Sequence, residues 1–517
     1  MKRPAIQQKT ERRISAALRL ALTAILLLLQ IALVLFLSYL LRSRLMFGYV
    51  VVQVIAVVCA LRIYNRPGGL SYKAGWILLV LALPVVGLIL YYLWNGSRPG
   101  KRLDLQKRPM PGRSEREEEE SARRIEKLRK QYPLWGRLAT YLHRQGFPLW
   151  SDTQVQYFPT GQAYLEDLLD RAAQAEHFIF LEYYIAGQGK IWTALTDILC
   201  RKAAVGVEVK LLFDDFGSML RLPDEEQERL RAAGIQLRMF NPVHHYVNRL
   251  YFNYRDHRKI ACIDGDIAYT GGVNLADEYA NLVERFGYWK DSGVRLEGKG
   301  AWGLTREFIR MWERLGGSFE REHDYYRPVV AAPVESFCQC VSDGPDNNPA
   351  NTVEDTFLQL IQSGRSMVYI TTPYLAIDES MIRALCIAGD SGVDVRLMLP
   401  GIPDHKFAYW VAESYFGQLM HHGVKLYRYR PGLLHGKTVM VDREAAFVGT
   451  VNMDYRSFQL HFECGVLFYG MPVVEELLED MDEIMACSDP VTREEWQRRP
   501  LRRKVLGSVL RPFAMWM

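Results

Sequence analysis

The sequence predicts an α/β protein built from two similar α/β/α sandwich halves related by a pseudo-twofold axis, preceded by an α-helical membrane anchor. Three observations lead to this prediction. The first hundred residues contain long apolar runs, the order strand, helix, strand occurs twice in the remainder, and one polar motif recurs at a fixed spacing. With 517 residues, of which 49% are apolar, the chain is long enough for two or more globular units.

The predicted anchor covers residues 1–95. An α-helix rises about 1.5 Å per residue, so roughly 20 apolar residues cross the hydrocarbon core of a bilayer. We therefore expect two or three transmembrane helices, and Pro84 lies inside the last of the apolar runs. Three runs contain no charged residue: Leu20 to Leu41 with 22 residues, Leu45 to Leu61 with 17, and Ala74 to Trp94 with 21.

Positive charge flanks these runs on both sides, before residue 20 and again between residues 98 and 113. Because cytoplasmic flanks carry the excess of Lys and Arg, three full spans cannot place both stretches in the cytoplasm. The number and orientation of the spans therefore stay open. Residues 96–135 follow as a charged linker, and their run of Glu, Arg and Lys predicts a solvated helix.

Charge is distributed unevenly along the chain. Residues 1–113 carry a net +15 and residues 491–517 a net +5, which leaves −15 on residues 114–490. Nucleic-acid binding relies on basic side chains that displace counterions, so an acidic body argues against a nucleic-acid partner. Basic side chains beside apolar segments are typical of contact with anionic membrane lipid. The last stretch fits either an amphipathic helix on such a surface or a frayed basic tail.

The body of the chain contains an internal repeat. The strand, helix, strand order of residues 178–213 returns at residues 367–399, and each copy is followed at matching spacing by a Gly, a strand and a Pro. Alternating strands and helices indicate a sandwich in each half, and two similar halves can pack about a twofold axis. The predicted parts are a first half at 136–327, a crossover at 328–350, a second half at 351–490 and a basic amphipathic tail at 491–517.

One polar motif occurs once in each half: a His, a Lys two residues later, an Asp five residues after that, and then an Asn three residues after a glycine. Two copies in register are a far more specific signal than one short motif. The eight positions, each pair separated by 178 residues, are His257 and His435, Lys259 and Lys437, Asp264 and Asp442, and Asn274 and Asn452.

Strand geometry gives this motif a chemical use. Side chains at i and i+2 lie on the same face of a strand, so each His emerges beside its Lys. Two halves placed face to face would surround one phosphodiester with two imidazoles and two ammonium groups. One His can attack phosphorus while the other protonates the leaving alcohol oxygen. The two Lys and two Asn would stabilise the developing charge, so we expect no metal and no cofactor.

A histidine nucleophile also needs its second ring nitrogen held by a carboxylate. Alignment of the halves places Asp291 and Glu463 at equivalent positions beyond the motifs, and we expect Glu463 to stand behind His435. The alternative is an ordinary acid at the end of a strand. Asp264 has the opposite strand parity from the Lys and precedes Gly265 at an expected hairpin turn, which favours a structural role for it and for its counterpart Asp442.

These residues carry a resemblance to a known family. The paired motifs resemble the His-Lys-Asp signature of the phospholipase D superfamily, and the chain is similar to bacterial cardiolipin synthases over nearly its whole length. Two positions depart from that family's pattern, with His461 where Asn is more common and Gly436 where Ala or Ser is usual. The similar segments are Phe-Leu-Glu182-Tyr-Tyr, Asp214-Asp215-Phe-Gly217-Ser218, Asn253-Tyr-Arg255-Asp-His257-Arg-Lys259, Gly271-Gly272-Val-Asn274-Leu-Ala-Asp277-Glu278-Tyr279, Gly449-Thr-Val-Asn452-Met-Asp454-Tyr-Arg456-Ser457 and the membrane region Leu45 to Trp94.

The resemblance implies two phospholipase D-like halves and a reaction in which two phosphatidylglycerol molecules give cardiolipin and glycerol through a phosphatidyl-histidine. It implies that His257 is the nucleophile and His435 the acid and base, an assignment that the near-symmetric sequence does not test. It also implies a protein of the bacterial cell (inner) membrane with its catalytic domain on the cytoplasmic side. By the family signature the catalytic set is His257, Lys259, Asp264, His435, Lys437 and Asp442, with Asn274 and Asn452 binding substrate and Asp291 and Glu463 orienting the histidines.

Three other functions are compatible with parts of the sequence. A hydrolytic phospholipase D, or another phosphatidyltransferase of the superfamily, differs only in which acceptor reaches the intermediate. A membrane-tethered nuclease is opposed by the acidic body. An inactive lipid-binding scaffold is opposed by the two complete motifs, for which it would have no use. The sequence leaves the acyl-chain preference and the oligomeric state open.

Overall fold

The structure is a computed structural model of the chain. It describes residues 46–66, 69–95, 115–218, 221–242, 254–329, 336–345 and 351–516. The chain divides into two units: one covers the first hundred residues with a short later segment, and the other covers the remainder. The two units are described separately.

The described part of the first unit consists of three apolar helices, α2 (Met46–Tyr64), α3 (Leu70–Ala82) and α4 (Pro84–Asn95). The expectation of one continuous helix over Ala74–Trp94 is wrong, because the helix is interrupted at Leu83, where φ is −129°. Pro84 explains the interruption, since proline disfavours helical backbone in the residue before it and has no N–H to donate.

These three helices lie within the predicted membrane anchor. The expected span Leu45–Leu61 corresponds to α2, whereas the expected span Leu20–Leu41 lies outside the described residues. Among the helices of residues 46–66, 69–95 and the other described ranges, none combines the length and the apolar character needed to cross a membrane.

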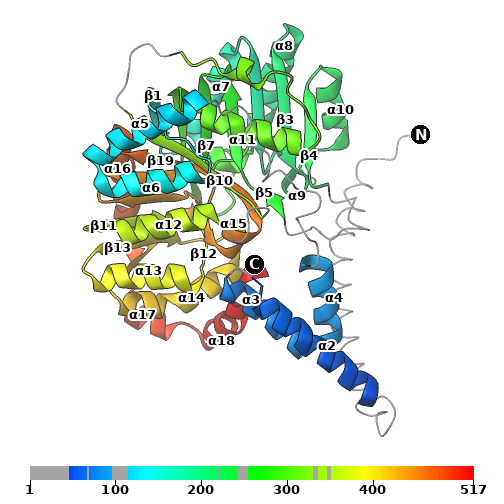
Figure 1. The fold of residues 1–517 in the computed structure, drawn as a ribbon, viewed down its shortest axis with the longest axis vertical. Helices are drawn as coiled ribbons and strands as arrows, with labels where there is room; N and C mark the ends of the chain where they lie inside the picture. The colour runs from blue at the N-terminus through cyan, green and yellow to red at the C-terminus, as the bar shows by residue number, and fades with distance from the viewer. Residues whose placement is uncertain are drawn as a thin grey trace. The chain divides into compact units, whose positions relative to one another are not determined.

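The second unit contains one main β-sheet in each half (Figure 1). The first sheet has seven strands in the order β1 (Thr153–Phe158), β9 (Gly293–Gly298), β7 (Ile267–Gly271), β6 (Lys259–Ile263), β2 (Phe178–Tyr183), β3 (Glu208–Asp214) and β4 (Gln236–Phe240). The second has nine strands, with the order β10 (Cys338–Asp343), β19 (His461–Tyr469), β17 (Ala445–Gly449), β16 (Thr438–Val441), β11 (Met367–Thr371), β13 (Asp394–Pro400), β14 (Lys425–Tyr429) and β20 (Ser488–Pro490), and with β5 (Arg255–Asp256) beside β19.

The two strand orders match position by position, which confirms the internal repeat. In each sheet, three neighbouring strands run parallel, β2-β3-β4 in the first half and β11-β13-β14 in the second. The strand that follows the His of each motif, β6 or β16, pairs antiparallel with the first of these. The expected hairpin turn after β6 is present as a three-residue loop, 264–266, in which Asp264 and Gly265 both have positive φ.

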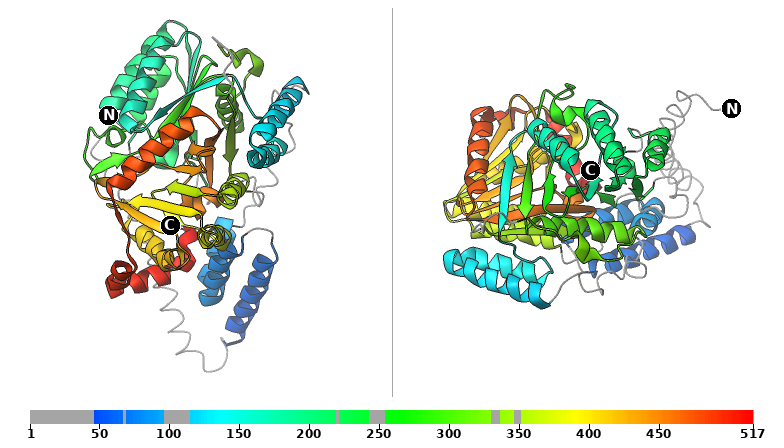
Figure 2. Two further views of the ribbon diagram at one scale, coloured as in Figure 1. Left: turned by 90° about the vertical axis from the view of Figure 1, so that its left-hand side faces the viewer. Right: turned by 90° about the horizontal axis from the view of Figure 1, so that it is seen from above.

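Helices cover both sheets, because the strands carry apolar side chains that must be buried on both faces. Figures 1 and 2 show the helices of the two halves on opposite outer sides of the unit. Two further helices, α11 (Ala301–Arg314) and α16 (Pro472–Ala486), share one apolar core with the inner faces of both sheets. The outer helices are α7 (Gly161–Gln174), α8 (Lys190–Ala204) and α10 (Asp224–Ala232) on the first half, and α12 (Thr352–Ser363), α13 (Glu379–Asp390) and α14 (Lys406–His421) on the second.

The burial of strand β2 explains why its first four residues, 178–181, are all apolar. Phe178 and Phe180 lie in the core between the sheets, whereas Ile179 and Leu181 lie in the outer core beneath α7 and α8. Side chains alternate between the faces of a strand, so a strand covered on both faces has no position for a polar residue facing water.

Three of the expected parts need correction. The charged linker is not only a solvated helix, because α5 (Glu115–Gln131) buries Ile125 and Leu128 in the core of the second half. The helix after it, α6 (Pro133–Arg144), packs in the same core although its sequence position suggested the first half. Strand β10, inside the expected crossover, is the edge strand of the second sheet.

The basic tail is helical and packed against the second half. It contains α17 (Arg493–Arg498), α18 (Leu501–Leu510) and the 3₁₀ helix η6 (Arg511–Trp516). The backbone of Gly507 lies so close to the Trp410 carbonyl oxygen that an added Cβ would be 2.4 Å from it. Three apolar side chains spaced four residues apart on α18 remain exposed: Leu501, Val505 and Val509.

Candidate active site

Both motifs lie where a short strand leads into the main sheet. His257 lies between β5 and β6, and His435 lies between β15 (Gly432–Leu434) and β16. The two His and the two Lys side chains are all buried. The structure brings the motifs together, since the charges of Lys437 and His435 both act on His257.

Each short strand pairs with a strand of the other half. β5 runs parallel to β19, and the backbone N–H of His257 donates to the carbonyl oxygen of Phe462 at 2.9 Å. β15 runs parallel to β8 (Tyr288–Lys290), and the N–H of His435 donates to the carbonyl oxygen of Lys290 at 2.7 Å. Two strand pairs therefore cross between the halves and fix the backbone of both histidines.

Because of this crossing, each histidine is oriented by a carboxylate of the other half. Nδ1 of His257 lies 2.9 Å from Oε1 of Glu463, and Nδ1 of His435 lies 2.6 Å from Oδ2 of Asp291. The expectation that Glu463 stands behind His435 is therefore wrong. Glu463 lies on β19, which pairs with β5 of the first half. Asp291 directly follows β8, which pairs with β15 of the second half.

The two carboxylates are held in different ways. Glu463 accepts hydrogen bonds from the hydroxyls of Thr450 and Ser457, the latter at 2.7 Å. Asp291 accepts one from the backbone N–H of Ser292 at 2.9 Å. At the position equivalent to Thr450, Gly272 makes room for Asp291, because an added Cβ would lie 2.0 Å from its Oδ1.

The two lysines bring positive charge to the histidines. Nζ of Lys259 donates to the carbonyl oxygen of His257, and Nζ of Lys437 donates to that of His435. Burial lowers the pKa of Lys259 to about 7 and that of Lys437 to about 8, although nearby carboxylates act in the opposite direction. A bound phosphate would favour the protonated forms of both lysines, because it adds a negative charge beside them.

The two histidines differ in their protonation. Burial and the charges of Lys259 and Lys437 move the pKa of His257 well below its usual range. Burial and Lys437 also lower the pKa of His435, but there Asp291 opposes the change. For Asp291, burial works against ionisation, yet Lys437 and His435 outweigh it and lower the pKa. In the described chain neither Nε2 has a hydrogen-bond partner, so both remain available to a substrate.

Asp264 and Asp442 do not belong with the histidines, which corrects their inclusion in the catalytic set. Asp264 accepts hydrogen bonds from the backbone N–H groups of residues 176–178 at 2.7 to 2.9 Å. Asp442 accepts the equivalent bonds from residues 365–367 at 2.7 to 3.0 Å. Each carboxylate thus binds the backbone at the start of the neighbouring strand, β2 or β11, which is the structural role that strand parity favours.

The two asparagines also differ. Oδ1 of Asn274 accepts from the N–H of Ile185 at 3.0 Å, and its Nδ2 donates to the Tyr279 hydroxyl at 2.7 Å. These contacts make Asn274 a support for Tyr279, and its expected contact with substrate stays a prediction. Within the described residues, the buried Oδ1 of Asn452 has no hydrogen-bond partner.

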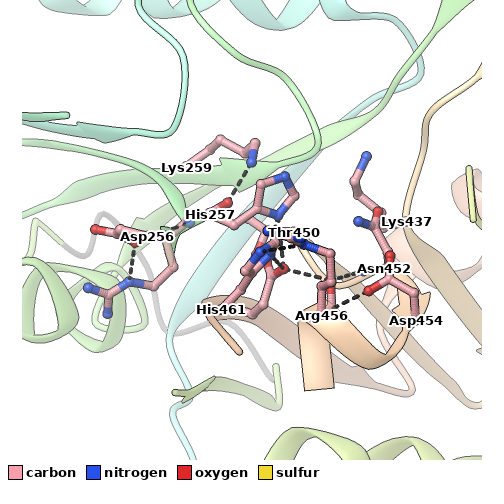
Figure 3. Close-up of polar contacts among 12 residues, drawn as sticks. Asp256, His257, Lys259, Lys437, Thr450, Asn452, Asp454, Arg456 and His461 are labelled. Atoms are coloured by element: carbon pink, nitrogen blue, oxygen red, sulfur yellow. Dashed lines mark hydrogen bonds and ion pairs between the residues drawn. The ribbon is translucent and has the colours of Figure 1, made fainter. Parts of the chain in front are cut away.

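Several side chains around the histidines were not singled out by sequence reasoning. The Tyr184 ring lies 5.1 Å from that of His257, and the rings of Tyr279 and Trp289 lie 5.7 and 5.2 Å from that of His435, measured between centroids. Figure 3 shows Arg456 in contact with His461 beside His257. Tyr184, Tyr279 and Arg456 lie inside the segments that resemble the family, and this resemblance is the sequence signal that points to them.

One group of side chains has the proximity that a metal ion requires. Among the described residues, donor atoms of His257, His461 and Glu463 lie within 4.8 Å of one another. The charges of Lys259, Lys437 and Arg456 all act on His257, and they would also repel a cation bound there. The same charges favour an anion.

Comparison with known proteins places this site in a family. Residues 165–312 and 357–485 match the family described as "Cardiolipin synthase, PLD-like domain", and residues 51–95 match "Phospholipase_D-nuclease N-terminal". A cardiolipin synthase of Geobacillus kaustophilus is 32% identical over 468 residues, covering 89% of this chain and 91% of the relative. The chain belongs to the cardiolipin synthase family of the phospholipase D superfamily.

The chain is also similar to one further relative and to one solved structure. An uncharacterized protein of Streptococcus mutans is 37% identical over 84% of this chain and 94% of its own length. A phosphatidylserine synthase of Haemophilus influenzae has the same fold, with a TM-score of 0.55 over 72% of this chain and 96% of that structure, at 14% sequence identity.

Proposed function

We propose that this protein synthesises cardiolipin by transferring a phosphatidyl group from one phosphatidylglycerol to another, with release of glycerol. The observation that carries the proposal is the pair of buried histidines whose Nδ1 atoms face carboxylates and whose Nε2 atoms are free, with two lysines beside them. The acidic body supports a lipid over a polynucleotide as the phosphodiester.

In the first step, Nε2 of neutral His257 attacks the phosphorus of the donor lipid. The bond between phosphorus and the glycerol oxygen breaks, and that oxygen takes a proton from protonated His435. Glycerol leaves, and the phosphatidyl group is bound to His257. Lys259 and Lys437 stabilise the negative charge that develops on the phosphoryl oxygens.

In the second step, the terminal hydroxyl of another phosphatidylglycerol attacks the same phosphorus. Its proton passes to His435, the bond between phosphorus and His257 breaks, and cardiolipin leaves. Both histidines return to their starting states. The stronger lowering of the pKa at His257 supports it as the nucleophile, since a nucleophile must be neutral and a general acid must carry a proton.

The test uses full-length protein in phosphatidylglycerol vesicles, with lipid products and glycerol followed by mass spectrometry. We expect cardiolipin and glycerol in equal amounts, and a loss of more than about a thousandfold in both His257→Ala and His435→Ala. Phosphatidic acid without cardiolipin would mean that water is the acceptor and would refute the transfer reaction.

A second assay separates the two histidines. A donor whose leaving group is p-nitrophenolate needs no proton from His435, so His435→Ala should accumulate a phosphatidyl-histidine that is stable to base and labile to acid. His257→Ala should form no such adduct. An adduct in His257→Ala and none in His435→Ala would reverse the assignment of roles.

We also propose that residues 1–95 hold the enzyme on the bacterial cell membrane, with the catalytic unit on the cytoplasmic side. The three apolar helices support this, and the exposed Leu501, Val505 and Val509 of α18 supply a surface for anionic lipid between basic side chains. The exposed Cys487 provides a test in a Cys59→Ser/Cys200→Ser background. An impermeant maleimide should label it only after the cells are permeabilised, and labelling in intact cells would contradict the orientation.

A further inference from the structure

The proposed reaction needs two phosphate sites, and the inference below rests on that proposed function. The donor's phosphate reacts between the two histidines. The acceptor phosphatidylglycerol brings a second phosphate, one glycerol unit away from its attacking hydroxyl, whereas water brings none. A site that favours transfer over hydrolysis should therefore hold one more fixed cation near the histidines.

Arg456 is such a cation. It lies on α15 (Tyr455–Gln459), is partly buried, and its charge acts on both His257 and Tyr184. Its Nε donates to Nε2 of His461 at 3.2 Å (Figure 3). Within the described chain, its two terminal nitrogens have no hydrogen-bond partner and no carboxylate forms an ion pair with it.

His461 fixes the Arg456 side chain without neutralising it. Because its Nε2 accepts from Arg456, the proton of the neutral ring is on Nδ1, which lies 3.6 Å from Oε1 of Glu463. Burial lowers the pKa of His461 to about 3, so the ring carries no charge at neutral pH. Its centroid lies 5.4 Å from that of His257, which places the guanidinium close to the reacting centre.

Among the described residues, the first half has no cation at the position equivalent to Arg456. The spacing of 178 residues pairs Arg456 with Glu278. The carboxylate of Glu278 lies 2.6 Å from Arg221 and 3.2 Å from Arg285, so its charge is compensated. In the described part of the chain, the pair of Arg456 and Glu278 thus breaks the near-symmetry of the two histidines and two lysines, and the two sides can bind different parts of the substrates.

We propose that Arg456 binds the non-reacting phosphate of the acceptor phosphatidylglycerol and that His461 positions its guanidinium. A guanidinium can present two parallel N–H donors to one phosphate. Bound in this way, the acceptor holds its terminal hydroxyl beside the phosphatidyl group on His257, where His435 can take the proton. Arg456 then determines which acceptor is used, while the two lysines serve the reacting phosphate.

The test compares two acceptors for one intermediate. Vesicles of phosphatidylglycerol are mixed with isotopically labelled free glycerol, which lacks a phosphate and returns labelled phosphatidylglycerol when it attacks the phosphatidyl-histidine. In Arg456→Gln, the ratio of cardiolipin to labelled phosphatidylglycerol should fall about tenfold or more, the effect of losing a charge-assisted hydrogen-bond pair. The share of phosphatidic acid should rise, because water then competes better.

Matched variants exclude general effects of charge and of folding. Arg285→Gln removes a cation from the equivalent region of the first half and should leave the product ratio within about twofold of the wild type. Arg456→Lys keeps one charge but not the paired donors, and should give an intermediate ratio. His461→Gln keeps an acceptor for Arg456 and should lower the ratio less than His461→Leu does.

The outcomes distinguish the inference from the function on which it rests. An equal fall of both products in Arg456→Gln would overturn the inference, because it would place Arg456 at the donor's phosphate. An unchanged ratio and rate would overturn it as well. Phosphatidic acid in place of cardiolipin from the wild-type enzyme would refute the proposed function itself, and the acceptor site with it.

Discussion

The two halves of the catalytic unit share one strand order and one motif but support that motif with different residues. In the first half Gly272 makes room for a short carboxylate, and in the second Thr450 donates a hydrogen bond to a longer one. Asn274 is engaged by protein groups, whereas Oδ1 of its counterpart Asn452 has no partner among the described residues. The comparison shows that the two halves repeat the backbone arrangement but hold their motifs with different side chains.

The crossed carboxylates allow the strongest test of this comparison. With the p-nitrophenyl donor, formation of the phosphatidyl-histidine requires His257 and its orienting carboxylate but no acid. Glu463→Gln should therefore slow adduct formation by about a hundredfold to ten-thousandfold, the range expected when an orienting carboxylate is lost. Asp291→Asn should slow this step far less and should instead slow turnover of phosphatidylglycerol.

Rapid-quench measurement of the adduct gives both rates, and thermal unfolding of each variant controls for folding. A larger effect of Asp291→Asn on adduct formation would show that each carboxylate serves the histidine of its own half. It would also contradict the distances of 2.9 and 2.6 Å between the partners.

The pH dependence of activity provides a second comparison, between the two lysines. Both must be protonated to stabilise the phosphoryl oxygens, and their pKa values are about 7 for Lys259 and about 8 for Lys437. With the p-nitrophenyl donor, which needs no proton from His435, kcat/KM of the free enzyme should fall as the pH rises through this range, because the lysines lose their protons. With phosphatidylglycerol the fall should begin at lower pH, because His435 must carry the proton that it donates and its pKa is lowered. On the acid side the fall should begin only well below pH 6.5, because His257 must be neutral and its pKa is lowered.

Arginine variants show which lysine sets the alkaline limit. Lys259→Arg should move this limit to higher pH more than Lys437→Arg does, since a guanidinium keeps its charge and Lys259 has the lower pKa. Replacing either lysine with Met should cost about a hundredfold to a thousandfold at neutral pH. Lys425→Arg, at an exposed position, is the control. An alkaline limit that does not move in either lysine variant would contradict the assignment.

The smallest effect on activity is expected at Asp264 and Asp442. Changing either residue to Ala removes the hydrogen-bond acceptor of three backbone N–H groups. This loss should lower the free energy of unfolding by about 1–3 kcal/mol. Below the melting transition, kcat should stay within about threefold of the wild type. Calorimetry and the vesicle assay measure the two quantities, and a loss of activity without a loss of stability would return these residues to the catalytic set.

Much of this arrangement could be predicted from the sequence, because a repeat and a strand period are local properties. The spacing of 178 residues identified the matching His and Lys positions, and parity placed Asp264 at a turn. The pairing of carboxylates with histidines could not be predicted in this way. Alignment shows that Asp291 and Glu463 are equivalent, but which histidine each one faces depends on how β8 and β19 pair across the halves.

Two other differences have equally definite causes. The apolar run over Ala74–Trp94 is long enough for one helix, but Pro84 interrupts the helix at the residue before it. Arg456 lies in a segment that resembles the family, but its role can be inferred only from the residues around it in the structure. Its free terminal nitrogens and its contact with the uncharged His461 are tertiary facts that no spacing reveals.

The crossing of β5 with β19 and of β8 with β15 also determines when activity can first appear during synthesis. A ribosome that has completed the first half has made His257, but Glu463 is 206 residues further along the chain. The second strand pair, which orients His435, likewise needs both halves. A nascent or prematurely terminated chain therefore cannot transfer lipid, so the enzyme becomes active only when translation is nearly complete and the two halves have docked.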